Sequence, residues 1–245
     1  MHIGILQCDS VSSSLQTVYG DYPDMHRRLL TSSAMHFELK FYIYDLTASQ
    51  FPDTSSECDA WLITGSRWSV LDNDLWIAHA LQFVQQLHAE RRPLVGICFG
   101  HQLISQALGG KIGKADVGWG VGVHTIDILE RKRWMEPYRE KISLLVSHQD
   151  QVIKPPTEAM LLASHPFCHY DMLAIDDHIL TLQGHPEFPR GYARALMDKR
   201  RDRIGESTYN EGVASLEKPT DADVVGGWIL RFLGDALGKA QAPNY

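Results

Sequence analysis

The sequence Pro93-Leu-Val-Gly-Ile-Cys-Phe-Gly-His-Gln102, continued by Leu103-Ile-Ser-Gln-Ala-Leu-Gly-Gly110, joins two apolar patterns. Residues 94–97 are a short apolar run, which is typical of a buried strand in a parallel sheet. From Phe99 the apolar residues recur at helical intervals, and two glycines then supply a C-terminal stop. Cys98 therefore lies at a predicted strand-to-helix junction, between Gly96 and Gly100.

This junction suits a nucleophile. Gly-x-Cys-x-Gly has the form of a nucleophile elbow, in which small neighbours permit a sharp, strained turn that presents the side chain. The following helix directs its free N–H groups and positive dipole end at the sulfur, which favours the thiolate. The N–H of Phe99 can also face an oxyanion on a substrate. The alternative is a buried structural cysteine, because free cysteine is among the most buried residue types.

Composition narrows the class of protein. The 245 residues suffice for one large α/β domain or two small ones, and 44% hydrophobic with 22% charged residues is an ordinary globular composition. A formal net charge of −7 argues against a nucleic-acid or membrane partner. We predict no signal peptide and no membrane span, and the four cysteines contain no CxxC pair. We therefore expect a soluble, cytoplasmic protein.

Apolar spacing in the first half predicts strands that alternate with helices. The expected strands are 2–7, 37–44, 60–64 and 94–97, and the expected helices are 23–35, 75–90 and the one that starts at 99. Residues 9–22 are predicted as a loop. Such alternation indicates βαβ units and a mostly parallel sheet.

The second half is predicted to contain more antiparallel pairing. The expected strands are 121–129, 142–147, 160–164, 172–175 and 179–183, and Asp176-Asp-His178 is a plausible hairpin turn between the last two. Helices are expected at 189–203 and 224–237, with a polar loop over 206–219. No linker or repeat marks a boundary, so we expect a single domain, 1–245, with a C-terminal helical extension over about 204–245.

A second motif, Gln183-Gly-His-Pro-Glu-Phe188, follows an apolar strand, and its His185 lies 87 residues beyond Cys98. A cysteine nucleophile needs a base, and the base needs a group that holds its tautomer. The proline stiffens the backbone, so the Glu187 carboxylate stays close enough to orient the His185 imidazole. Taken alone, a histidine at a strand end is more often a surface residue.

Together the two motifs resemble the class I glutamine amidotransferases of the Cys-His-Glu triad type. The resemblance covers residues 2 to about 203 and is nearest to the single-domain branch of GMP synthase amidotransferases and γ-glutamyl peptidases. It implies Cys98 as nucleophile, His185 as base and Glu187 as the residue that orients the base. It also implies a flavodoxin-like, doubly wound, mostly parallel sheet with an additional antiparallel part, and a ligand beyond the strand C-termini.

The loop Thr64-Gly-Ser-Arg-Trp-Ser-Val70 stands where this family has a Gly-Gly-Pro loop. The resemblance makes the backbone N–H of Ser66 the second oxyanion donor, beside that of Phe99. The match departs here, because Ser66 and Arg67 replace the second glycine and the proline, so Ser66 must tolerate the backbone angles of the loop. The alternative is an ordinary loop without a catalytic role.

Further candidates would line the substrate pocket. Val146-Ser-His-Gln-Asp150 resembles the family's Ser-His-x-Asp stretch, which contacts the amino-acid end of glutamine, and Gln102 resembles a residue that hydrogen-bonds the same end. A helix-surface amide is the alternative for Gln102. Side chains just after the oxyanion donor can meet the leaving group. The predicted substrate-binding residues are Gly65, Arg67, Trp68, Gln102, Ser147, His148 and Gln149.

The other groups of histidine, cysteine and basic residues in the sequence are not predicted to form functional sites. The histidines and cysteine at 165, 168, 169 and 178 match no standard zinc spacing, so we expect no metal, and no motif indicates a cofactor. The basic runs 131–133 and 199–203 are predicted to be solvated faces.

Three hypotheses for function follow. The first is a glutaminase or amidotransferase-like hydrolase that cleaves the γ-glutamyl amide of a small molecule through a Cys98 thioester and delivers ammonia to a synthase partner. The second is an independent γ-glutamyl peptidase, the branch to which the Gly-Ser loop looks closest. The third is a non-catalytic binding or regulatory module on the same fold, which the intact Cys98, His185 and Glu187 disfavour.

Overall fold

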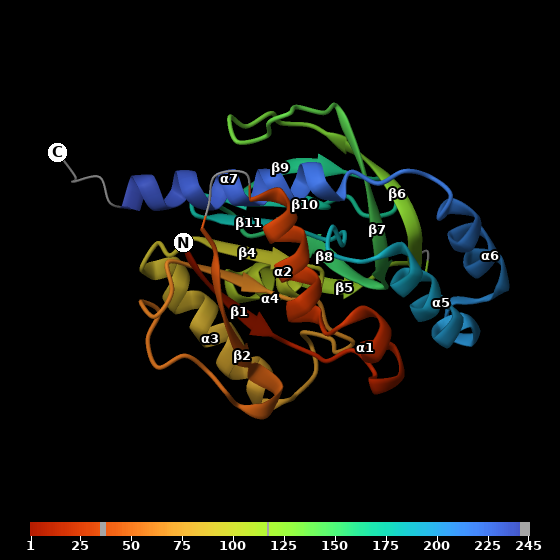
Figure 1. Cartoon of the computed structure of the whole chain (residues 1–245), viewed down its shortest axis with the longest axis horizontal. Helices are drawn as coiled ribbons and strands as arrows, with labels where there is room; N and C mark the ends of the chain where they lie inside the picture. Colours follow the sequence, from red (N-terminus) through yellow and green to blue (C-terminus); the bar gives the residue numbers. More distant parts are fainter. Residues whose placement is uncertain (35–37, 117, 241–245) are drawn as a thin grey trace.

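The computed structural model describes residues 1–34, 38–116 and 118–240 (Figure 1). Its strands are β1 His2–Gln7, β2 Lys40–Asp45, β3 Ala60–Ile63, β4 Leu94–Ile97, β5 Lys111–Lys114, β6 Gly120–Ile128, β7 Lys141–His148, β8 Asp150–Lys154, β9 Ala159–Ser164, β10 Met172–Ile175 and β11 Ile179–Leu182. Its helices are α1 Ser13–Tyr19, α2 Tyr22–Ser33, α3 Leu75–Ala89, α4 Phe99–Ala107, α5 Arg190–Ile204, α6 Glu206–Ser215 and α7 Ala222–Ala240, with a 3-10 turn at Leu46–Ala48.

One mixed sheet organises the described residues. Its nine strands lie in the order β2-β1-β3-β4-β11-β10-β9-β6-β7, and β5 pairs with β8 in a separate two-stranded sheet. The strands from β2 to β11 are parallel, and their order is that of a flavodoxin-like sheet. The pairs from β11 to β7 are antiparallel, and β10 and β11 form the expected hairpin. The predicted fold class is confirmed.

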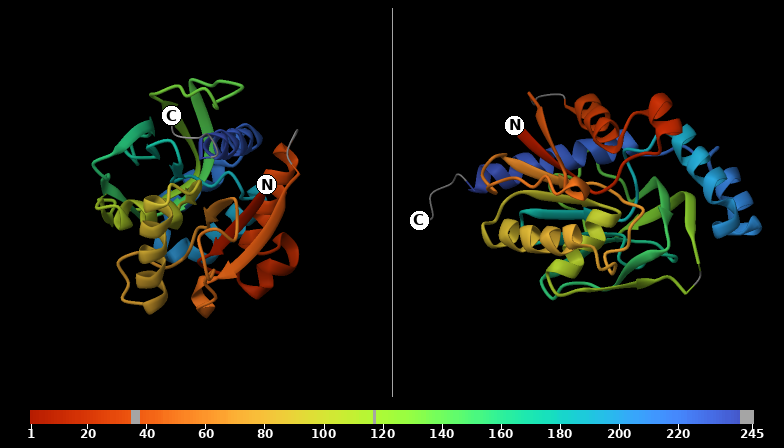
Figure 2. Two further views of the ribbon diagram at one scale, coloured as in Figure 1. Left: turned by 90° about the vertical axis from the view of Figure 1, so that its left-hand side faces the viewer. Right: turned by 90° about the horizontal axis from the view of Figure 1, so that it is seen from below.

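Helices cover both faces of the parallel part because its strands are apolar on both sides. In β3, Ala60 and Leu62 belong to a core shared with α7, whereas Trp61 and Ile63 belong to a second core shared with α3 and α4. This alternation is the period of two that a strand imposes on its side chains. Figures 1 and 2 show α2 and α7 packed together, with α3 on the opposite side of the sheet.

Two segments predicted as loops are helical. Residues 9–22 contain α1, and residues 206–219 contain α6, so the loop predictions are wrong over those spans. Gly212 of α6 lies against β6, where an added Cβ would be 2.7 Å from the Val121 side chain, and Tyr209 is buried with its hydroxyl donating to Asp198 of α5 at 2.6 Å. The helix is held by contacts with both α5 and β6, so its low apolar content was misleading. The strands β5 and β8 were also not predicted.

Most other boundaries agree with expectation within a few residues. The expected helix end at Met35 and strand start at Phe37 lie outside the described residues, and β2 begins at Lys40. No helix within the described ranges has the length and apolar character needed to cross a membrane.

The region after residue 204 contributes to the central core. Trp228, Leu230 and Leu233 of α7 are buried in the same cluster as Ile3 and Ile5 of β1, and α7 packs along α2. Because the two ends of the chain share one core, we propose that residues 1–245 form a single domain.

Candidate active site

Cys98 occupies a strained position between β4 and α4. Its backbone has φ 53° and ψ −101°, a conformation that costs a residue with a side chain roughly 1–3 kcal/mol. The flanking glycines make the turn possible: a Cβ on Gly96 would lie 2.6 Å from the Gly100 backbone, and one on Gly100 would lie 2.6 Å from the Ile63 carbonyl. The junction has the strain and the crowding of a nucleophile elbow.

His185 is held from several sides after β11. Its N–H donates to the Leu145 carbonyl at 2.7 Å, and its Nδ1 lies 2.6 Å from Glu187 Oε1. The Phe188 ring stacks on the imidazole, with 3.8 Å between ring centroids. Cys98, His185 and Glu187 are all buried. The Cys98 side chain lies within hydrogen-bond reach of His185, although the two residues are 87 positions apart in the sequence. The fold therefore brings the two predicted motifs together.

The charges of this group stabilise one another. Burial disfavours a charged imidazole, but the Glu187 carboxylate and the hydrogen-bonded Cys98 sulfur outweigh burial and raise the pKa of His185 above its usual value. Burial likewise works to raise the pKa of Glu187, and the adjacent imidazole more than reverses it, so that the pKa of Glu187 is lowered. The site therefore favours a proton on His185 next to an ionised Glu187.

The Gly65–Ser66 turn packs directly on these residues. A Cβ on Gly65 would lie 2.8 Å from His185 Cε1 and 3.6 Å from Cys98 Cβ, so a side chain at this position would collide with the imidazole. Phe99 is the first residue of α4, and N–H groups of a first helical turn have no partner inside the helix. Within the described residues, the Ser66 N–H makes no hydrogen bond. Both predicted oxyanion donors thus have a free N–H.

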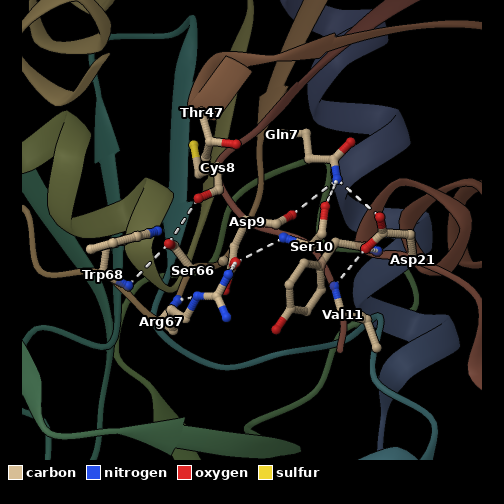
Figure 3. Close-up of polar contacts among 12 residues, drawn as sticks. Gln7, Cys8, Asp9, Ser10, Val11, Asp21, Thr47, Ser66, Arg67 and Trp68 are labelled. Atoms are coloured by element: carbon tan, nitrogen blue, oxygen red, sulfur yellow. Dashed lines mark hydrogen bonds and ion pairs between the residues drawn. The ribbon is translucent and has the colours of Figure 1, made fainter. Parts of the chain in front are cut away.

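Asp9 holds the loop that carries Ser66 through contacts with Arg67 (Figure 3). The buried Asp9 carboxylate accepts the Arg67 N–H at 3.0 Å and lies 3.0 Å from the Arg67 guanidinium. Ser66 Oγ donates to the Cys8 carbonyl at 2.9 Å and accepts the Trp68 N–H at 3.1 Å. Asp9 was not predicted as a site residue, although an acidic residue two positions after a buried first strand was an available signal. Arg67, expected to meet a leaving group, already has an ionic partner.

A cavity of about 250 Å³ opens at Cys98. It is formed by the loop after β3, the start of α4, the ends of β5 and β7, the residue before β6, and α5. The lining residues are Ser66, Arg67, Trp68, Ser69, Asp72, Cys98, Gln102, Lys114, Trp119, Ser147, Gln149, Asp150, Arg200 and Arg203.

Of the predicted pocket residues, Gly65 and His148 are not among those that line the cavity, and Gln102 lines it with its amide nitrogen already bonded. His148 is not among the lining residues: it is buried, with Nδ1 3.1 Å from the Asp150 carbonyl, because alternation along β7 turns it away from the side of Ser147. Gln102 does line the cavity, but its amide nitrogen donates to the Asp150 carbonyl at 2.7 Å and to Gln183 Oε1 at 3.0 Å. Only its carbonyl oxygen remains for a ligand, and its burial excludes the helix-surface alternative.

Basic residues of α5 reach the same cavity. The interpretation of 199–203 as a solvated face fits the exposed Lys199 and Arg201, but it is wrong for Arg200, which is half-buried and lines the cavity together with Arg203. A basic run on one helix carried no signal that two of its members would line a cavity. The described residues contain no group of three or more histidine, cysteine, aspartate or glutamate side chains arranged to hold a metal ion.

His26 of α2 lies behind Glu187 and was also not predicted. It is fully buried, and its Nε2 is 3.8 Å from Glu187 Oε1. Neither ring nitrogen has a hydrogen-bond partner within the described residues. Burial lowers the pKa of His26 despite the nearby carboxylate, so this ring is neutral. His26 therefore packs next to Glu187 without placing a second positive charge beside the carboxylate.

Known proteins are similar to this chain in sequence. The glutamine amidotransferase class-I family model matches residues 20–198. Gamma-glutamyl peptidase 3 of Arabidopsis thaliana is 30% identical over 200 residues, which cover 78% of this chain and 78% of that protein. A glutamine-hydrolyzing GMP synthase component from Sulfolobus acidocaldarius is 30% identical over 143 residues, covering 58% of this chain and 74% of that protein.

The fold is likewise shared with a solved structure. A glutamine amidotransferase from Thermotoga maritima has a TM-score of 0.73 at 14% identity, covering 99% of this chain and 100% of that chain. The family match spans most of the sequence, including both the Cys98 and the His185 motifs. The chain therefore belongs to the class I glutamine amidotransferase family.

Proposed function

We propose that this enzyme hydrolyses the γ-glutamyl amide bond of glutamine or of γ-glutamyl compounds, with Cys98, His185 and Glu187 as its catalytic triad. The observation that carries the proposal is the strained, buried Cys98 beside an imidazole whose proton is stabilised by Glu187. A thiolate next to a protonated histidine is an activated nucleophile.

The first half-reaction forms a thioester. The Cys98 sulfur attacks the γ-carbonyl carbon, and the N–H groups of Ser66 and Phe99 stabilise the negative charge on the carbonyl oxygen. The carbon–nitrogen bond then breaks as His185 passes its proton to the departing nitrogen. Ammonia leaves when the substrate is glutamine, and an amine leaves when it is a γ-glutamyl peptide.

The second half-reaction restores the enzyme. Water loses a proton to His185 and adds to the thioester carbon, the carbon–sulfur bond breaks, and glutamate is released. Glu187 keeps the imidazole oriented and stabilises its charged form in both halves. Because this group is buried, each charge interacts more strongly than it would in water.

Of the two catalytic hypotheses, we favour a hydrolase that works without a synthase. The relative named gamma-glutamyl peptidase 3 supports this choice. The cavity supports it too, since its lining of tryptophan and arginine side chains offers contacts that ammonia cannot use. The second candidate function is a glutaminase that supplies ammonia to a synthase partner, and the GMP synthase relative supports it.

One assay tests the proposal. Purified protein is incubated separately with glutamine and with a γ-glutamyl dipeptide, and glutamate, ammonia and free amine are quantified. We expect glutamate from both and faster release from the dipeptide. An electrophilic glutamine analogue should add once, at Cys98, as located by peptide mass spectrometry. Absence of glutamate with both substrates, or labelling at Cys8, Cys58 or Cys168, would contradict the mechanism.

A further inference from the structure

Two arginines of α5 form a distinct feature of the cavity. Arg200 and Arg203 are three residues apart, so they project from the same side of the helix. Both line the cavity that contains Cys98, and their guanidinium carbons lie 5.6 and 5.5 Å from the centre of the Trp119 ring. Arg200 also donates to Ser147 Oγ at 3.1 Å. The indole therefore holds two cations at one wall of the site.

These cations lack the ionic partners that two other arginines of the same helix have. On the same helix, Arg194 pairs with Asp198 at 2.9 Å, and Arg201 donates to Glu206 at 2.8 Å. Within the described residues, neither Arg200 nor Arg203 has a carboxylate at ion-pair distance, although Arg200 is near enough to the Asp9 carboxyl to act toward lowering its pKa. The chain has 30 acidic residues against 23 basic ones, so carboxylates were not scarce. An unpaired basic cluster in a net acidic protein indicates an anionic ligand.

The acidic residues of the cavity gather elsewhere. Asp72 accepts the Ser69 N–H at 2.9 Å, and Asp150 accepts Ser69 Oγ at 2.6 Å. The cavity thus has an acidic side around Ser69 and a basic side around Trp119. A γ-glutamyl ligand carries an ammonium that suits the acidic side and an α-carboxylate that suits Arg200, which contacts Ser147. A leaving group with a free carboxylate adds a second anion, for which Arg203 remains.

We propose that Arg203 and Trp119 bind the carboxylate and the adjoining side chain of a peptide-like leaving group. The inference rests on the proposed γ-glutamyl hydrolase function and names its substrate class: γ-glutamyl amides of amino acids or short peptides with a free carboxylate. Cys98 is buried, whereas Arg203 is exposed at the mouth, so Arg203 lies on the side through which a longer leaving group extends. The indole face adds a surface for an apolar side chain, which glutamine's ammonia does not possess.

The test compares two neighbouring arginines on two matched ligands. The ligands are γ-glutamylphenylalanine with a free carboxylate and the same compound as its C-terminal amide. Arg203→Gln removes the proposed contact, and Arg201→Gln is the control, because Arg201 is exposed and pairs with Glu206. The measured quantity is the ratio of kcat/KM for the acid to kcat/KM for the amide. We expect Arg203→Gln to lower this ratio roughly tenfold or more, the scale of one charge-assisted contact, and Arg201→Gln to leave it as in the wild type.

A binding measurement separates this inference from the proposed function. Calorimetry with the Cys98→Ala protein gives the Kd of both ligands without turnover, and the Arg203→Gln change is then added to that protein. Preference for the acid that disappears with Arg203→Gln supports the subsite even if the wild type hydrolyses neither ligand, a result that would sink only the proposed function. An acid-to-amide ratio that Arg203→Gln leaves unchanged, in turnover and in binding, overturns the subsite.

Discussion

The cavity has two walls of opposite character. The inner wall, formed around Cys98 with His185 and Glu187 behind it, is buried and strained, and its charges are compensated within the group. The outer wall, which includes Arg67 and Arg203, is exposed and basic. Bond making benefits from burial, because charges interact strongly away from water, whereas recognition of a varied leaving group needs access. The buried inner wall therefore suits the chemical steps, and the exposed outer wall suits selection of the substrate.

The largest effect is expected at the inner wall. Cys98→Ala should lower kcat roughly 10⁴-fold or more for every substrate, because no other group can form the thioester. The thermal midpoint should stay within a few degrees, since alanine is smaller than cysteine and fits the crowded turn. Activity and thermal unfolding are measured on the same preparation. Substantial turnover by this variant would remove Cys98 from the mechanism.

Substitutions of the three residues of the inner wall should lower kcat by different amounts. His185→Asn should be about as damaging as Cys98→Ala, because His185 moves the proton, whereas Glu187→Gln should be roughly 10- to 100-fold less damaging than either, because Glu187 only orients and stabilises the imidazole. The double change at Cys98 and His185 should lose little more than the worse single change. Losses that multiply would show that the two residues serve separate steps.

Burial also makes the fold sensitive to acid. Burial lowers the pKa of His101, a buried residue of α4, to about 3, so the unfolded chain binds a proton on this side chain near pH 6.5 and the folded chain does not. The free energy of unfolding should therefore fall as pH drops from 7 to 5, by about 2 kcal/mol for this residue.

A His101 variant separates the contribution of His101 from those of other buried groups that titrate over the same pH range. The pKa of buried Asp171 is raised by burial to about 7, which works in the opposite sense, so only the difference between wild type and His101→Gln is informative. Urea unfolding at pH 5 and 7 should show a smaller loss in the variant, whose amide can replace the 2.8 Å contact with Thr181 Oγ1. Equal losses in both proteins would show that His101 is not the group that titrates.

The smallest effect is expected where the two walls join. Asp9→Asn keeps the shape but removes the charge that holds Arg67, so the Ser66 N–H should be less well positioned. We expect kcat to fall about tenfold for glutamine and for γ-glutamyl peptides alike, with KM changed less. Adding Arg67→Ala to this variant should cost little more, because the pair is already broken. A loss confined to peptides would instead assign Arg67 to the leaving group.

Much of the parallel half could be predicted from sequence. Its strands, such as β3 and β4, are continuous apolar runs because both faces of the sheet are covered, and the glycines around Cys98 mark a turn that only small residues permit. The motif around His185 predicted a partner for Cys98, although not the distance between them. Local spacing carries such information because burial and turn geometry act on neighbouring residues.

The surroundings of the cavity could not be predicted in this way. Asp9 holds a loop that lies 58 residues away, Arg200 and Arg203 face Trp119 from a helix that begins 71 residues later, and α6 packs on α5 and β6. The position of Asp9 after a strand gave a signal for the residue but not for its partner, and the roles of all these residues come from contacts across long chain separations. Local patterns were therefore sufficient for the fold class and the candidate nucleophile, while the anchoring of its loop and the charge of its outer wall depend on which distant side chains the packed elements bring together.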